Sequence, residues 1–196
     1  MTFARIDGAW FAGPKLEHAP PFLVGHWSAG EGGPERIYRA LSGRGLSCQF
    51  AMGLDGVTVQ LAPLDVRCAH AGSLGNVGLG IEIANRGVPD DSGRSPRPFD
   101  LVRIRGSKVR AVRFTEAQIK SWVELCEWFA ATYGAPRVVP SELRTYAPSE
   151  IRTFRGVLEH LHISSRKIDA GGHLVGALVS AGWQRVRPES KGWVPE

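Results

Sequence analysis

Short hydrophobic runs, separated by glycine, proline and polar residues, dominate the first third of the chain. The run Phe22-Leu23-Val24-Gly25-His26 predicts a buried strand that ends in a histidine. Residues 48–53 and 57–61 predict two more strands, and Asp55-Gly56 between them is typical of a hairpin turn. We therefore expect a β-hairpin to follow the first strand.

Alternating apolar and polar positions mark residues 78–85. Leu79, Ile81 and Ile83 fall on one face of the predicted strand, and Glu82 falls on the other. A carboxylate at this position points away from the apolar side of a sheet. Glu82 is therefore a candidate for chemistry, and a surface position on the strand is the alternative.

The longest periodic segment, residues 115–133, predicts an amphipathic helix. Thr115 suits its N-cap, Gln118 completes a capping box, and Gly134 predicts its end. Cys126 belongs to the apolar stripe, so we expect it to pack rather than react. The stripe recurs at helical spacing and comprises Ile119, Trp122, Val123, Cys126, Phe129, Ala130 and Tyr133.

The remaining segments complete an α/β pattern in a chain of 196 residues, a length that fits one domain. We expect a single α/β domain over residues 1–196, with a central mixed β-sheet flanked by α-helices. Its core would cover about residues 20–183, with an insertion at about 86–113 and a short C-terminal tail. The other expected elements are helices at 35–42 and 173–182, a strand at 157–160, loops at 86–98 and 138–150, and a hairpin at 101–114.

The net charge of +5 and the pI near 9.4 favour an anionic partner. Basic residues concentrate between residues 94 and 113, but Asp100 is interleaved with them and no aromatic platform accompanies them. We therefore expect no nucleic-acid partner. A nucleic-acid-binding protein that uses this basic stretch remains the less favoured alternative.

Cysteine usage and the N-terminal residues indicate the compartment of synthesis. Three widely spaced cysteines without a Cys-x-x-Cys pair argue against a disulfide framework and favour a reducing compartment. Residues 1–8 have no unbroken apolar run, and about 20 consecutive apolar residues, the length of a membrane span, occur nowhere. We expect cytoplasmic synthesis without a signal peptide, followed by release to the cell wall through a lysis or secretion system if the substrate lies there.

Three distant segments hold the parts of a hydrolytic zinc site. His26, His160 and Asp169 offer two imidazoles and a carboxylate at strand ends or in loops. Such a set binds Zn²⁺ and leaves one position open, and Glu82 and Lys167 remain for proton transfer and for stabilising negative charge. This pattern predicts a metal-dependent amide hydrolase. A structural histidine is the alternative for each imidazole taken alone.

Five motifs in order resemble the zinc-dependent N-acetylmuramoyl-L-alanine amidases of the type-2 amidase and peptidoglycan-recognition-protein superfamily. The resemblance spans residues 22–172. It comprises the first-ligand strand at residues 23–29, the Asp-Gly hairpin at 47–60, a segment at 67–72 similar to Trp-His-Ala-Gly, the Asn-x-x-x-Gly-Ile-Glu strand at 76–85, and the last motif at 160–172.

The resemblance implies residue roles and a substrate. His26, His160 and Asp169 would be zinc ligands, with the aspartate replacing the cysteine that some members use. Glu82 would move protons and Lys167 would stabilise the oxyanion, while the substrate would be peptidoglycan or a muropeptide cleaved between N-acetylmuramic acid and L-alanine. We expect the chain to act as a monomer.

Two further residues, His70 and Asn76, would contact substrate according to the same resemblance. A structural imidazole is the alternative for His70, and the capping of a turn is the alternative for Asn76. The last motif departs from the family pattern because His162 stands where the family has aspartate, so His162 competes with His160 as the second imidazole ligand. We prefer His160 because it keeps the Arg-Lys-x-Asp run close to register. The alternative function is a peptidoglycan-binding module without catalysis.

Overall fold

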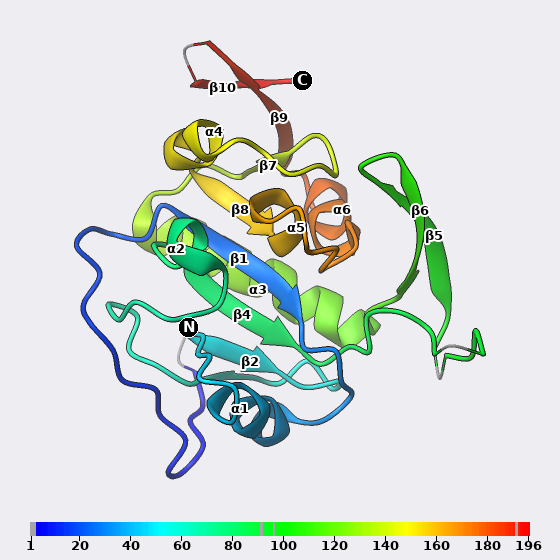
Figure 1. Cartoon of the computed structure of the whole chain (residues 1–196). Helices are drawn as coiled ribbons and strands as arrows, with labels where there is room; N and C mark the ends of the chain where they lie inside the picture. Colours follow the sequence, from blue (N-terminus) through cyan, green and yellow to red (C-terminus); the bar gives the residue numbers. More distant parts are fainter. Residues whose placement is uncertain (1–2, 91, 96, 191) are drawn as a thin grey trace.

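A five-stranded mixed sheet forms the centre of the molecule, in the order β3-β2-β4-β1-β8 (Figure 1). The computed structural model describes residues 3–90, 92–95, 97–190 and 192–196. β1 pairs in parallel with β4 and β8, β2 pairs in parallel with β4, and β2 and β3 form an antiparallel hairpin. The strands are β1 (Phe22–Trp27), β2 (Phe50–Met52), β3 (Thr58–Gln60), β4 (Leu79–Ile83) and β8 (Gly156–Glu159).

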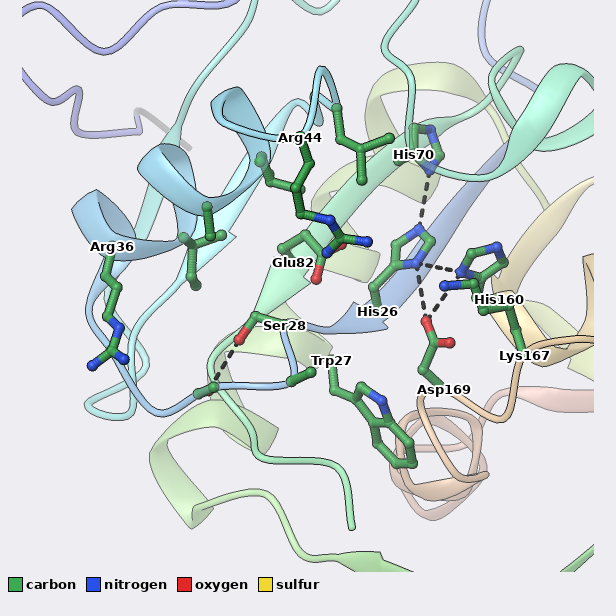
Figure 2. A pocket seen from close by; sticks show the side chains of 17 residues that line it. His26, Trp27, Ser28, Arg36, Arg44, His70, Glu82, His160, Lys167 and Asp169 are labelled. Carbon is green, nitrogen blue, oxygen red and sulfur yellow. Dashed lines mark hydrogen bonds and ion pairs between the residues drawn. The ribbon is translucent and has the colours of Figure 1, made fainter.

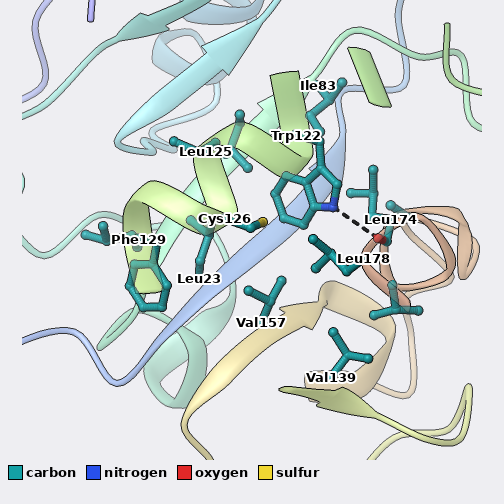
Figure 3. Close-up of a cluster of buried hydrophobic side chains, with 14 of the residues drawn as sticks. Leu23, Ile83, Trp122, Leu125, Cys126, Phe129, Val139, Val157, Leu174 and Leu178 are labelled. Atoms are coloured by element: carbon teal, nitrogen blue, oxygen red, sulfur yellow. Dashed lines mark hydrogen bonds between the residues drawn. The ribbon is translucent and has the colours of Figure 1, made fainter. Parts of the chain in front are cut away.

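The α3 helix (Glu116–Tyr133) covers one face of this sheet, next to α6 (His173–Ser180) (Figure 1). The predicted capping box is confirmed, since Thr115 Oγ1 accepts from the Gln118 N–H and Gln118 Oε1 accepts from the Thr115 N–H, both at 3.0 Å. Trp122 fills the interface and donates its indole N–H to the Leu174 carbonyl at 3.0 Å (Figure 3). Cys126 is buried in this cluster, as expected from its place in the stripe.

Alternation along β1 and β4 assigns their side chains to opposite faces of the sheet. Leu23 and the predicted apolar positions of β4 face the α3 side, where they belong to the main core (Figure 3). Phe22 and Val24 lie in a second cluster on the opposite face, and His26 has the same parity. Glu82 is opposite His26 in the parallel register, so both side chains project on the side away from α3.

A hairpin of β5 (Phe99–Ile104) and β6 (Ser107–Val112) extends beside the sheet, as predicted (Figure 1). Residues 91 and 96 of the loop predicted before it lie outside the described residues. On the other side of the sheet from α3, α1 (Pro34–Ser42) packs through Ile37 and Leu41. In the part of the chain that the structure describes, none of the helices is long and apolar enough to cross a membrane.

The prediction of a loop at residues 138–150 is wrong, because this segment contains β7 (Val138–Pro140) and the start of α4 (Pro148–Thr153). The expected tail also forms strands, β9 (Gln184–Glu189) and β10 (Gly192–Pro195), which make a second sheet in the order β10-β9-β7. β7 has only three residues and pairs with a strand more than 40 residues away, so local pattern carries no signal for it. Two further short helices, α2 (Gly72–Gly75) and α5 (His160–Ile163), were not predicted.

Candidate metal centre

Three side chains from distant segments converge at one edge of the sheet (Figure 2). His26 lies near the end of β1, His160 begins α5 directly after β8, and Asp169 lies in the loop that follows α5. Nδ1 of His26 is 3.0 Å from Nδ1 of His160, and each of these atoms is 3.1 Å from Asp169 Oδ2. A tetrahedral Zn²⁺ with its usual bond lengths places its donors about 3.3 Å apart, so the spacing fits such an ion.

His70 fixes the orientation and tautomer of His26. Nε2 of His70 lies 3.4 Å from the Gly78 carbonyl, which can only accept a hydrogen bond, so Nε2 carries the proton. Nδ1 of neutral His70 then accepts from His26 Nε2–H at 3.1 Å. This chain leaves the lone pair of His26 on Nδ1, facing His160 and Asp169. A hydrogen-bond partner that fixes the tautomer and ring orientation of a histidine in this way is common around metal sites.

Gly80 makes room for the His70 ring. A Cβ atom at Gly80 would lie only 2.7 Å from the ring atoms Cγ and Nδ1 of His70. The glycine in the Gly-Ile-Glu segment therefore has a steric role at the site. It lets β4 pass directly beneath the imidazole that supports His26.

The protonation states of His26 and Asp169 suit a cation. Burial lowers the pKa of His26, and the charge on Asp169 opposes that shift only in part. Burial alone would raise the pKa of Asp169, but its close contacts with the His160 and His26 rings outweigh that effect and hold the pKa well below its usual value. The result is an ionised carboxylate beside a neutral imidazole, the form in which these groups bind metals.

Glu82 is a buried carboxyl group on the wall of the same pocket. Its Oε2 is buried without a hydrogen-bond partner among the described residues. Burial raises the pKa of Glu82 to about 8, and repulsion from Asp169 adds to the shift. The positive charges of Lys167 and Arg44 oppose it. A buried carboxyl group with an unused oxygen at a pocket wall is typical of functional sites.

Lys167 also lines the pocket, from the exposed loop between α5 and Asp169 (Figure 2). The tip of the β5–β6 hairpin holds this loop, because Arg105 donates to the Lys167 carbonyl at 3.0 Å. The Arg105 backbone N–H in turn donates to the Leu143 carbonyl at 3.0 Å. The hairpin thus braces the segment that carries Lys167 and Asp169.

The structure does not bring His162 or Asn76 into the pocket. His162 is fully buried on the far side of α5, where Nδ1 accepts from the Glu159 N–H at 2.9 Å and the ring packs on Tyr146. Asn76 Oδ1 accepts from the backbone N–H groups of His70 and Ala71 at 3.0 and 2.8 Å, which is the capping role. The geometry thus favours His160 over His162 for the cluster.

Sequence reasoning missed Glu159, which anchors the segment after Asp169. Its carboxylate is buried and accepts from the Gly172, Leu174 and Val175 N–H groups at 2.7–3.0 Å. It therefore ties the end of β8 to the first turn of α6, on either side of the cluster. A glutamate inside an apolar strand was the signal that could have identified it.

The pocket beside the cluster has a volume of about 360 Å³. One side carries the converging groups, and the other is formed by the loop after β1 and by α1. This space is large enough for part of a peptide or sugar residue next to the candidate metal centre.

A comparison with protein families identifies the chain. Residues 17–172, most of its length, match the profile described as N-acetylmuramoyl-L-alanine amidase. The chain belongs to this family. The resemblance drawn from the motifs is therefore confirmed, and the amidase class applies. A comparison with curated proteins finds no match.

Solved structures of amidases share the fold of this family member. AmiD from E. coli, in complex with anhydro-N-acetylmuramic acid-L-Ala-D-γ-Glu-L-Lys, is 20% identical with a TM-score of 0.57, covering 96% of this chain and 68% of that one. AmpDh3 from Pseudomonas aeruginosa, in complex with anhydromuramic pentapeptide, is 17% identical with a TM-score of 0.57, covering 97% and 70%. The endolysin amidase LysCS from Clostridium intestinale is 14% identical with a TM-score of 0.52, covering 84% and 85%. These likenesses confirm the predicted single α/β domain with a mixed central sheet.

Proposed function

We propose that the chain is a zinc-dependent hydrolase that cleaves the amide between N-acetylmuramic acid and L-alanine in peptidoglycan or muropeptides. The observation that carries this proposal is the convergence of His26, His160 and Asp169 beside Glu82 in one pocket. Family membership supports the reaction. The donor set, two imidazoles and one carboxylate, supports zinc.

The muropeptide ligands of two structural neighbours support the substrate class. AmiD is complexed with a fragment that carries L-Ala-D-γ-Glu-L-Lys, and AmpDh3 with an anhydromuramic pentapeptide. The endolysin among the neighbours supports release of the protein to the cell wall as a route to polymeric substrate. We therefore include soluble and polymeric substrates in the test.

His26 and His160 would hold the ion through Nδ1, and Asp169 through its carboxylate. A zinc ion bound there supplies Lewis-acid chemistry, which polarises a carbonyl oxygen and makes water more acidic. His70 keeps His26 in the tautomer that this role needs. Glu159 and Arg105 hold the backbone on both sides of Asp169.

Glu82 would act as general base and then as general acid. In its ionised form it takes a proton from the attacking water, and it then gives this proton to the nitrogen of the departing L-alanine. Its raised pKa suits the second step, because a carboxyl group that titrates near neutral pH retains a proton long enough to deliver it.

Lys167 would stabilise the negative charge that develops on the carbonyl oxygen in the transition state. Its ammonium group lies on the pocket wall, and its charge already acts on both Glu82 and His26. A fixed positive charge aimed at an oxyanion is among the largest contributions to catalysis.

The test is mass spectrometry of muropeptides and purified sacculi after incubation with the protein, with and without a chelator. We expect free stem peptide to appear, to vanish with chelator, and to return when zinc is added back. Glu82→Gln should keep zinc and lose most turnover. Glu116→Gln, an exposed change on α3, should keep both zinc and turnover. Binding of sacculi without any release of stem peptide would contradict the proposal and favour a recognition module.

A further inference from the structure

The turn of the β5–β6 hairpin holds an arginine in a backbone conformation that arginine disfavours. Ile104 pairs with Ser107, so Arg105 and Gly106 form a two-residue turn between the strands. Their φ angles are +48° and +81°, both positive as in a type I′ turn. Asparagine or glycine is usual at the first of these positions, because the left-handed region is strained for most other residues. Strained residues of this kind cluster at functional sites.

Arg105 joins the tip of the hairpin to two neighbouring segments. Its backbone N–H donates to the Leu143 carbonyl at 3.0 Å. Its Nη1 donates to the Lys167 carbonyl at 3.0 Å and lies 3.5 Å from Thr145 Oγ1. Thr145 in turn donates its hydroxyl to the Leu161 carbonyl on α5 at 3.0 Å. One side chain thus connects the hairpin, the segment before α4 and the loop after α5.

The loop that receives this contact has little other support. Residues 165–167 are exposed, and the Lys167 N–H donates to the Ser164 carbonyl at 3.1 Å, a bond within the loop itself. Among the residues that the structure describes, Arg105 makes the only hydrogen bond that reaches residues 165–168 from outside residues 160–172. The position of the loop backbone at Lys167 therefore depends on the hairpin tip.

Lys167 is the residue of this loop whose side chain lines the pocket, beside Asp169 (Figure 2). Its ammonium group stands at the end of a flexible four-carbon stem. A positive charge stabilises a developing oxyanion best when it is already held in place before the reaction. A support for the Lys167 backbone is therefore a support for this charge.

The base of the hairpin is attached independently of its tip. Asp100 Oδ2 lies 3.1 Å from His173 Nε2 on α6. The Val112 N–H donates to the Gly87 carbonyl at 2.8 Å, and the Val112 carbonyl accepts from Asn85 Nδ2 at 3.0 Å. A change of the Arg105 side chain should therefore leave the hairpin in place and alter only the contact at the tip.

We propose that Arg105 is a positioning residue for catalysis. Its guanidinium group fixes the backbone of Lys167, so that the ammonium group is directed at the carbonyl oxygen of the scissile amide. This contact explains an arginine at a turn position that favours asparagine or glycine. The inference rests on the proposed function and goes beyond it, since it assigns part of the rate to a residue on the hairpin, outside the pocket lining.

The variant Arg105→Asn separates the contact from the stability of the hairpin. It removes the guanidinium group and introduces the residue that suits a type I′ turn, so the free energy of unfolding should stay the same or increase. On a muropeptide, kcat should fall about tenfold while KM and the zinc affinity stay within about twofold. Lys108→Gln removes the same charge from an exposed position of β6 and should keep kcat. An unchanged kcat in Arg105→Asn, or an equal loss in Lys108→Gln, overturns the proposal.

A double-mutant cycle tests whether Arg105 acts through Lys167. In the Lys167→Met background, adding Arg105→Asn should change kcat by less than about twofold, because the group that Arg105 positions is already missing. A further tenfold loss in that background overturns the positioning role, since it shows that Arg105 acts on the reaction by another route.

Amide hydrogen exchange separates failure of this inference from failure of the proposed function. The exchange of residues 164–168 is measured by mass spectrometry on the protein without substrate. Faster exchange in Arg105→Asn than in the wild type and Lys108→Gln supports the hold of Arg105 on the loop, even if the wild type hydrolyses no muropeptide. Equal exchange in all three proteins overturns the inference even if hydrolysis is fast.

Discussion

His26 on β1 is the register partner of Glu82 on β4. The two residues therefore project from adjacent parallel strands, whose backbones lie about 4.8 Å apart, into the same pocket. Their separation is set by the hydrogen-bonded sheet rather than by loops. The imidazole of the candidate metal centre and the carboxyl group that we propose for proton transfer are thus placed by the most rigid part of the fold.

The zinc content of single variants should show which histidine of the last motif binds the metal. His160→Ala removes a donor that lies 3.0 Å from His26 Nδ1, so the zinc affinity should fall by more than about 100-fold, given that loss of a supporting partner alone costs 10–100-fold. His162→Gln should leave the zinc affinity within about threefold, because its ring packs on Tyr146 instead. Elemental analysis after dialysis checks both, with His18→Ala as the exposed control. Loss of zinc in the His162 variant alone would reverse the assignment.

Lys167→Met should lower kcat by about 100-fold or more while KM changes little. The reason is that a charge aimed at the developing oxyanion acts in the transition state and not in the ground state. Steady-state kinetics on a muropeptide measures this, with Arg166→Gln as the control because this exposed neighbour does not line the pocket. An unchanged kcat would remove Lys167 from the mechanism.

In the metal-free protein, Glu82 should contribute a loss of stability as the pH rises from 4.5 to about 8. Glu82 ionises near 4.5 in the unfolded chain and near 8 in the folded state, so within this window the folded state retains a proton that the unfolded state has released. Ionisation of the unfolded chain then favours unfolding, by at most about 1.4 kcal/mol per pH unit. Denaturant titrations in chelator at several pH values measure the slope.

The variant Glu82→Gln isolates this contribution. The lowered pKa values of four histidines act with the opposite sign below 6.5; these are His26, His70, His162 and His173. Burial raises the pKa of Glu159 to about 7, which acts with the same sign as Glu82. These contributions are the same in both proteins. The difference in the free energy of unfolding between the wild type and Glu82→Gln should therefore be small at pH 4.5 and grow toward pH 8. Parallel pH curves for the two proteins would show that Glu82 titrates normally.

Gly80→Ala should disturb the site through His70. The added methyl group needs space that the imidazole ring occupies, so we expect a loss of about 1–3 kcal/mol in the free energy of unfolding. Displacement of the ring from His26 should also weaken zinc binding by about tenfold or more. Competition with a fluorescent zinc chelator measures the second effect. Gly176→Ala, where a Cβ meets nothing within 4 Å, is the control, and equal zinc affinity in both variants would contradict the role of His70.

Much of the fold could be predicted because its central strands and its longest helix carry their own local signals. The alternation of apolar and polar residues along β4 predicted that Glu82 lies on the face opposite the main core. Thr115, as a predicted N-cap, correctly predicted where α3 begins. The segments that failed depend on distant partners. β7 exists because β9 lies beside it, and a three-residue strand has no period of its own to detect.

The convergence of the three candidate metal ligands could be predicted from the sequence, whereas the contacts that support them could not. The order of the motifs predicted that His26, His160 and Asp169 lie together, because these residues can bind a metal and stand at the ends of predicted elements or in loops. The helix that begins at His160 turns His162 to the other side of α5, and no periodicity in four residues predicts this. The bracing of Lys167 by Arg105 joins residues 62 positions apart, and only the folded chain reveals such a contact.

The most direct test of the metal centre is diffraction from zinc-loaded crystals at wavelengths on either side of the zinc absorption edge. We predict one strong anomalous peak within about 2.0–2.2 Å of His26 Nδ1, His160 Nδ1 and a carboxylate oxygen of Asp169, with Glu82 nearby but not bonded to it. A peak held by other residues, or these three side chains without a peak between them, would contradict the account.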